Sequence, residues 1–316
     1  MQFIKHFFRK KSRENKSDEL FKLSASLEKN KLNIEKLFDK CDDFTKRDFT
    51  MKNRRACLFY FDDMVSSENI SRFILDQLME TDIDSGTVKN AESIRNKLIP
   101  SHDVKISGDT EELLKAIYDG DCLILVDGLD EALIVNVRVS KGRIVGEPLI
   151  EVSAIGPQEG FVEDIHLNLA LLRKRIKTSK YKIEFTTKGR ITKNTFAIMY
   201  IEGIAKDKIV KELKDRIDLI DTDGFIDSGH LRRFISDNKL TIFPLEIITE
   251  RPDRCVNHLL EGRVVVMIDG SAFALIYPSV FIDLLKTADE AYMNYYMAVF
   301  LIFLRLVAFL ISTFGA

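Results

Sequence analysis

The sequence has 316 residues, enough for two domains of ordinary size. Hydrophobic residues make up 46% of the chain and charged residues 30%, which permits a packed core under a hydrated surface and excludes wholesale disorder. The formal net charge of -2 argues against a nucleic-acid partner. Composition therefore permits a folded, mixed α/β protein and leaves its chemistry open.

Residues 1–50 are predicted to form a basic and polar extension with helices. Residues 3–11 combine Phe and Ile with Lys and Arg, a pattern typical of a flexible basic tail or of a short helix on an anionic membrane surface. The four cysteines lie far apart without a C-x-x-C pair, and no secretory signal opens the chain. Both features predict reduced thiols and a chain that stays on the cytoplasmic side.

Residues 50–140 are predicted to form a first α/β lobe. Residues 56–61 are a continuous apolar run, as in a buried strand, and a helix with apolar residues at helical spacing follows. A second helix ends at Gly120, because glycine favours the left-handed conformation of a helix C-terminal cap. A strand, an Asp127-Gly128 turn and a further strand complete the lobe.

The same order of elements recurs in residues 195–285, the predicted second lobe. Gly120 matches Gly262, Asp127-Gly128 matches Asp269-Gly270, and the Ala-Leu-Ile run at 132–134 matches that at 274–276, all at a spacing of 142 residues. Agreement over a helix end, a strand, a turn and a second strand indicates an internal repeat. The predicted fold class is therefore α/β, with two linked, duplicated small lobes whose central strands are residues 123–126 and 264–268.

Residues 141–194 are predicted to connect the lobes through one amphipathic helix. Acidic residues come first along this helix and basic residues last, which complements the helix dipole by about 0.3–1 kcal/mol per well-placed group. The alternative is a contact surface, acidic at one end and basic at the other, for head-to-tail packing of identical chains.

Residues 292–316 are predicted to form a membrane helix that is apparently truncated. The segment 297–316 would span about 30 Å as a helix, the thickness of a bilayer core, and carries one charge, Arg305. Its apolar residues outweigh the cost of a central arginine by about 0–5 kcal/mol, so replacing Arg305 with Leu is expected to strengthen membrane retention. Arg305 needs snorkelling, a partner carboxylate or a water-filled neighbour. The alternative is a buried C-terminal helix of the second lobe.

The sequence contains no pattern typical of an enzyme. It lacks the glycine-rich phosphate loops, the G-x-S-x-G elbow and the paired histidines of common metal sites. Asp127 and Asp269 follow strands, as catalytic carboxylates often do, but each precedes a glycine, which predicts a role in a turn. We therefore expect no catalysis, no cofactor and no metal.

Several motifs occur in order in the second half of the chain. They supply the candidate interaction residues Gly156, Pro157, Glu159, Gly160, Phe161, Asn168, Arg173, Arg175, Glu202, Glu250, Arg251, Asp253, Arg254, Asp269 and Gly270, to which Arg305 is added. In this order the motifs resemble the GerA family of spore germination proteins, specifically the A subunit of a germinant receptor, over about residues 110–316. Gln158 and Ala272 depart from the family pattern, which usually has Arg and Pro there.

The resemblance implies a non-enzymatic, cytoplasm-facing region that couples nutrient sensing to the assembly and gating of an ion-conducting complex in the inner membrane of the spore. It implies a multi-pass membrane domain, of which this sequence holds the start of the first helix and which it would need in order to conduct ions. The implied partners are a transporter-like B subunit, a lipoprotein C subunit and further copies of the A subunit. Two alternatives stay open: the related stage V sporulation protein, which works without the nutrient-sensing partner, and a soluble two-lobed α/β ligand-binding or enzymatic protein.

Overall fold

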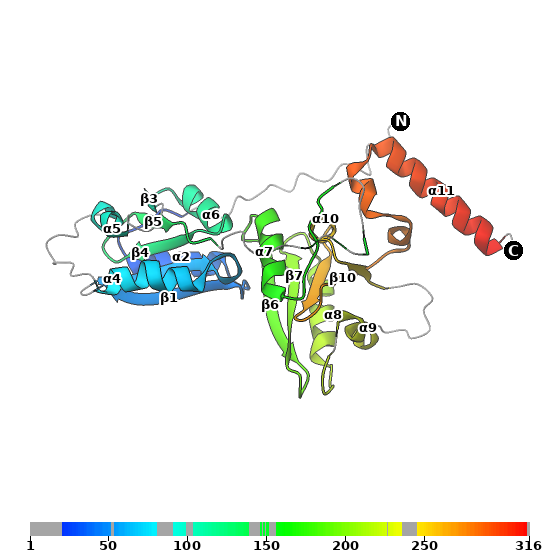
Figure 1. Cartoon of the computed structure of the whole chain (residues 1–316), viewed down its shortest axis with the longest axis horizontal. Coiled ribbons are helices and arrows are strands. Elements are labelled where there is room, and N and C mark those ends of the chain that lie inside the picture. Colours follow the sequence, from blue (N-terminus) through cyan, green and yellow to red (C-terminus); the bar gives the residue numbers. More distant parts are fainter. Residues whose placement is uncertain are drawn as a thin grey trace.

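The computed structural model describes residues 21–51, 54–80, 91–98, 104–138, 146, 148, 150–151, 156–225, 227–235 and 245–314. They form two α/β lobes and a long C-terminal helix (Figure 1). Each lobe is built on a five-stranded antiparallel sheet with helices on both faces. The basic aromatic segment at 3–11 lies outside the described residues.

The first lobe is built from the following elements in chain order. They are α2 (Leu27–Leu37), β1 (Phe44–Met51), β2 (Arg54–Phe61), η1 (Asp62–Met64), α3 (Ser67–Asn69), the π-helical η2 (Ile70–Leu75), α4 (Asp76–Glu80), α5 (Ala91–Leu98), β3 (Val104–Ser107), α6 (Thr110–Tyr118), β4 (Cys122–Val126) and β5 (Ala132–Val135). The strand order is β1-β2-β4-β5-β3, and the fully buried β4 lies at the centre. Alternate residues of β2 and β4 pack against α2 and α6 on one face and against η2, α4 and α5 on the other.

The second lobe repeats this plan. Its elements are α7 (Ile165–Arg175), β6 (Tyr181–Lys188), β7 (Asn194–Ile201), α8 (Asp207–Asp218), α9 (Ser228–Ile235), β8 (Ile247–Thr249), α10 (Pro252–Leu260), β9 (Val264–Ile268) and β10 (Ala274–Tyr277). The strand order β6-β7-β9-β10-β8 is the order of the first sheet. Helices α7 and α10 cover one face of this sheet, and α8 and α9 cover the other.

The predicted duplication is confirmed. Gly120 and Gly262 end α6 and α10 with φ of +89° and +87°. The amides of Asp127 and Asp269 donate hydrogen bonds to strand carbonyls in equivalent positions, both at 2.9 Å. Helix α7 and strand β6, which fall in the segment predicted to connect the lobes, occupy the places that α2 and β1 take in the first lobe.

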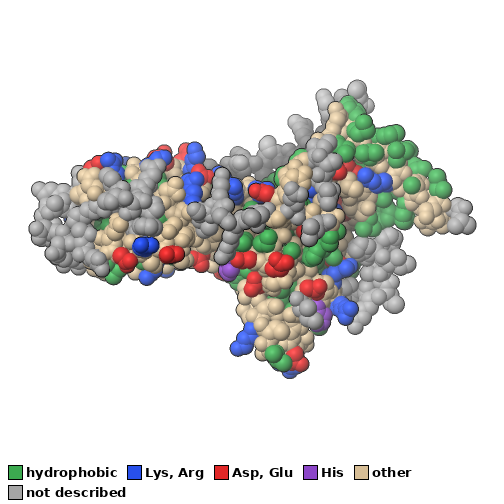
Figure 2. Space-filling view, viewed as in Figure 1, with side chains coloured by type: hydrophobic (Ala, Val, Ile, Leu, Met, Phe, Trp, Pro, Cys, Tyr) green, Lys and Arg blue, Asp and Glu red, His purple; other side chains and the backbone are tan. Residues whose placement is uncertain are grey.

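The C-terminal segment contains two 3-10 turns and one helix: η3 (Phe281–Leu285), η4 (Ala288–Tyr292) and α11 (Tyr295–Phe314). An 18-residue stretch of α11 has a mean hydropathy of 2.4, yet only 6% of that stretch is buried. It projects from the second lobe and carries a band of hydrophobic side chains on its surface (Figures 1 and 2). The alternative of a buried core helix is therefore wrong for this segment.

Candidate functional site

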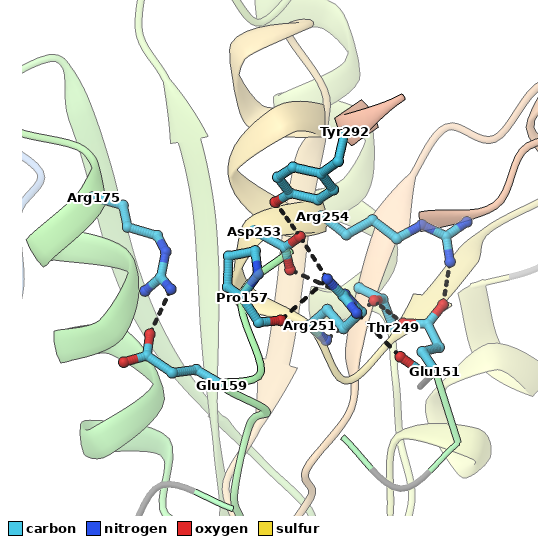
Figure 3. A network of polar contacts seen from close by, with 9 residues as sticks. All are labelled: Glu151, Pro157, Glu159, Arg175, Thr249, Arg251, Asp253, Arg254 and Tyr292. Atoms are coloured by element: carbon cyan, nitrogen blue, oxygen red, sulfur yellow. Dashed lines mark hydrogen bonds and ion pairs between the residues drawn. The ribbon is translucent and has the colours of Figure 1, made fainter. Parts of the chain in front are cut away.

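A polar cluster lies where the second lobe meets the segment that leads into α11 (Figure 3). We define the polar cluster as Glu151, Pro157, Thr249, Arg251, Asp253, Arg254 and Tyr292. Four of these residues come from β8 and the start of α10, two from the segment before α7, and Tyr292 from the end of η4.

Arg251 is the centre of the polar cluster. It immediately precedes Pro252, which opens α10, and Asp253 lies in the first helical turn. The Arg251 guanidinium is fully buried and donates from Nε and Nη2 to the Asp253 carboxylate at 3.1 and 2.9 Å. It also donates to the carbonyl oxygens of Glu151 and Pro157 at 3.2 and 3.3 Å. One side chain thus holds the helix start and the segment before α7 together.

Glu151 connects Arg254 and Thr249 within the cluster. Its carboxylate pairs with Arg254 and accepts a hydrogen bond from the Thr249 hydroxyl. The Thr249 hydroxyl in turn accepts from the Arg251 amide at 3.1 Å. Glu250 lies beside these residues, and its carboxylate accepts hydrogen bonds from the amides of Ile150 and Glu151.

Tyr292 connects the cluster to the segment before α11. Its hydroxyl donates to the Asp253 carboxylate at 2.6 Å. The Tyr292 ring lies against Gly156, where an added Cβ would be 2.8 Å from a ring carbon. Gly156 also has φ of +130°, so both the backbone and the contact require glycine.

The charges of the cluster stabilise one another. Burial opposes ionisation of Asp253, but its hydrogen bonds with Arg251 and Tyr292 outweigh that cost and lower the pKa of its carboxyl group. Burial and the Asp253 hydrogen bond raise the pKa of Tyr292 to about 12. The carboxylate is therefore ionised and the phenol protonated at neutral pH, which maintains the O–H···O contact between them.

The predicted Gly156–Phe161 motif lies next to the cluster. Pro157 supplies the carbonyl described above, and Glu159 pairs with Arg175 of α7 at 2.5 Å. Gly160 packs tightly, since an added Cβ would be 3.1 Å from the Pro148 nitrogen. The Phe161 amide donates to the Glu250 carbonyl at 2.7 Å, so two of the sequence motifs meet here.

Asn168 and the helix-capping residues order the start of α7. The Asn168 side chain exchanges two hydrogen bonds with the backbone of Val162, at 2.9 and 2.6 Å. Asp269 has the predicted turn position, and its carboxylate also accepts from the Ile165 amide at 3.4 Å. Gly270 follows with φ of +85°, and its amide donates to the Glu163 carbonyl at 2.9 Å.

Arg173 and Glu202 lie away from the polar cluster. Arg173 is buried at the boundary between the lobes, where it pairs with Asp43 of the first lobe. Glu202 is half exposed on the surface, 3.9 Å from Lys182. Arg305, on α11, donates to the Leu285 carbonyl at 2.8 Å and pairs with the carboxylate of Glu290, which is buried.

Comparison with known proteins places these features in a family. Residues 32–316 match the family described as Bacillus/Clostridium GerA spore germination protein, so the match includes the first lobe as well as the region from residue 110. Spore germination protein KA of Bacillus subtilis (strain 168) is 31% identical over 296 residues, which cover 92% of this chain and 54% of that protein. Spore germination protein A1 of the same strain is 33% identical over 277 residues, covering 86% and 56%.

Two further comparisons bear on the candidates. Stage V sporulation protein AF of Bacillus subtilis (strain 168) is 29% identical over 268 residues, covering 84% of this chain and 54% of that protein. The crystal structure of the N-terminal domain of the A subunit of the Bacillus megaterium spore germinant receptor GerK3 superimposes with a TM-score of 0.66 at 31% identity, covering 83% of this chain and 98% of that one. This chain spans about half the length of the curated relatives it matches.

Proposed function

The chain belongs to the GerA family of spore germination proteins, and on that basis we propose that it is the membrane-anchored, non-catalytic region of a germinant-receptor A subunit. Its lobes lie on the cytoplasmic side of the inner spore membrane. They couple nutrient sensing to the gating of an ion-conducting complex that includes further copies of this chain, a transporter-like B subunit and a lipoprotein C subunit.

The observation that carries this proposal is the connection between α11 and the second lobe. Helix α11 exposes apolar side chains that water solvates poorly, as expected for a segment in contact with lipid. Tyr292, three residues before α11, holds Asp253 and through it Arg251. A displacement of the helix would therefore be transmitted to the start of α10 and to the segment before α7.

Buried contacts between the lobes support the transmission of such a displacement from the second lobe to the first. Arg173 of α7 pairs with Asp43, and backbone hydrogen bonds join Asp42 to Ile183 and Ile183 to Lys40, at 2.9 and 3.2 Å. Because these groups are fixed by several contacts each, the lobes are suited to move as one body.

The pairing within the cluster favours a mechanical role over catalysis. Arg251 is paired with Asp253, and Arg254 with Glu151. Arg251 also donates to two backbone carbonyls, and Glu151 also accepts from the Thr249 hydroxyl. Catalytic acids and bases need a pKa near the working pH and access to substrate, whereas the pKa of Asp253 is lowered and its oxygens are occupied.

The proposal can be tested in spores that carry the full-length receptor subunit with Tyr292→Phe. Removing the hydroxyl should leave the amount of subunit in the inner membrane unchanged and reduce the nutrient response, measured as the fall in optical density of a spore suspension. Tyr296→Phe is the matched control, since Tyr296 is exposed at the start of α11. A normal response with Tyr292→Phe would contradict coupling through the polar cluster.

A further inference from the structure

The 3-10 turn η3 exposes its apolar side chains and buries its acidic one. Phe281, Ile282 and Leu284 are 41%, 40% and 48% exposed, whereas the side chain of Asp283 between them is only 2% exposed. Asp283 is bound by Arg263 at 2.7 and 3.0 Å and accepts from the Val280 amide at 2.8 Å. A turn that faces water would direct the carboxylate outward and the three apolar side chains inward.

This apolar surface is continuous with α11. The rings of Phe281 and Phe309 meet edge to face, with centroids 5.5 Å apart. Arg305 donates to the Leu285 carbonyl, which ends η3. The apolar side chains of η3 therefore lie alongside the second half of α11, and the two elements present one surface.

We infer that η3 is a second lipid-contacting element, whose apolar side chains contact the acyl chains of the bilayer beside α11. This inference rests on the proposed function, because lipid reaches η3 only where α11 is in the membrane. Three polar groups of this surface have partners, as burial in lipid requires: Arg263 neutralises Asp283, Arg305 binds the Leu285 carbonyl, and the Lys286 amide donates to the Asp283 carbonyl at 3.3 Å.

Lipid is the occupant that this continuity favours. The exposed side chains are large and apolar, and they border a helix whose own exposed side chains are also apolar. A turn anchored in this way fixes the second lobe against the membrane surface and limits the tilt of α11 relative to it.

The chain contains no tryptophan, so a single introduced Trp reports on one position. We would compare Phe281→Trp and Ile282→Trp with Phe303→Trp on α11 and Leu219→Trp, which is exposed on the second lobe. Each variant would be reconstituted into vesicles of phosphatidylcholine and phosphatidylglycerol, with and without brominated acyl chains that quench Trp on contact.

We expect the 281 and 282 probes to emit at shorter wavelength in vesicles and to lose most of their intensity to brominated lipid, as the 303 probe does, while the 219 probe is unaffected. Quenching at 303 alone would overturn the inference and leave the membrane anchor intact. Blue-shifted but unquenched emission at 281 and 282 would show that protein, such as a second copy of the chain, covers η3. Loss of quenching at 303 as well would contradict the proposed function itself.

Discussion

Arg173 and Asp43 join the two lobes through a buried ion pair whose N–O distances are 2.7 and 2.8 Å. The Arg173 guanidinium also lies over the rings of Phe61 and Tyr181, 4.4 and 4.6 Å from their centroids, and donates to the Tyr181 carbonyl at 2.8 Å. The predicted basic end of α7 thus makes a contact within the chain, between its lobes, in addition to complementing the helix dipole.

Replacing Arg173 with Met should destabilise the protein by about 3–5 kcal/mol, because the Asp43 carboxylate would stay buried without a partner. Urea unfolding of the full chain in detergent would measure the loss. Arg175→Met is the control, since the Arg175–Glu159 pair is partly exposed and should cost about 0–1 kcal/mol. Equal losses for the two variants would show that the buried Arg173–Asp43 pair contributes no more to stability than a partly exposed pair does.

Replacing Gly262 with Val should destabilise the second lobe more than Gly120→Val destabilises the first. Both glycines have positive φ, which costs a residue with a side chain about 1–2 kcal/mol. An added Cβ at Gly262 would be 2.7 Å from the Ile204 carbonyl oxygen, whereas at Gly120 its nearest neighbours would be Cβ and Cε of Met64, both at 3.3 Å. Limited proteolysis followed by mass spectrometry would identify the lobe that opens.

Gly203→Ala separates the two causes of this loss, since Gly203 has φ of +78° and open space around it. This substitution should lower the free energy of unfolding only by the cost of placing a side chain at positive φ. If Gly203→Ala and Gly262→Ala were equally destabilising, the contact with Ile204 would contribute nothing.

Stability should decline as the pH rises from about 7 to about 10. His166 of α7 lies 2.6 Å from Asp63 of the first lobe, and the hydrogen bond with Asp63 raises the pKa of His166 to about 9. A raised histidine pKa gives stability that is complete below its ordinary value of about 6.5 and is lost through about 9. Burial raises the pKa of Asp63 to about 6, so this carboxylate is ionised over that range.

Urea midpoints measured across that pH range would test this, with His166→Gln as the comparison. The variant should show a flatter dependence, and the difference should be small and sensitive to salt, because the His166 ring is largely exposed. A dependence that is identical in the variant would assign the decline to other groups.

The parts of the fold that local chemistry determines could be predicted from the sequence. A helix that ends in glycine and a strand that ends in Asp-Gly are set by residues within a few positions, so the two lobes and their central strands were predicted correctly. The distant residues that form hydrogen bonds with those turns could not be predicted. Asp127 and Asp269 accept hydrogen bonds from Leu27 and Ile165, which lie about a hundred residues earlier in the chain.

The same distinction applies to the polar cluster and to the ion pair between the lobes. Arg251 and Asp253 are two residues apart at a helix start, so the sequence alone identifies them as candidate interaction residues. Tyr292, Glu151 and Asp43 stand in no motif, and each acts across many residues of separation. A lone tyrosine or carboxylate in a sequence has no spacing that identifies such a partner.

The effect of Arg305→Leu on membrane retention is changed by the structure. Taken as an isolated charge in an apolar helix, Arg305 costs about 2.5–3.5 kcal/mol of insertion energy, and its removal should strengthen retention. The structure pairs Arg305 with Glu290, whose side chain is 7% exposed. Removing Arg305 alone leaves that carboxylate buried and unpaired, a change that offsets the gain.

We therefore expect Arg305→Leu alone to be retained no better than the unaltered chain when vesicles are sedimented after a urea wash. Arg305→Leu combined with Glu290→Gln should be retained more strongly, because both the charge in the helix and its buried partner charge are removed. Glu290→Gln by itself should weaken retention, since it leaves Arg305 without a countercharge. If Arg305→Leu alone matched the double variant, the ion pair would have no part in holding α11 against the second lobe, and the cost of Arg305 would be that of an unpaired arginine in lipid.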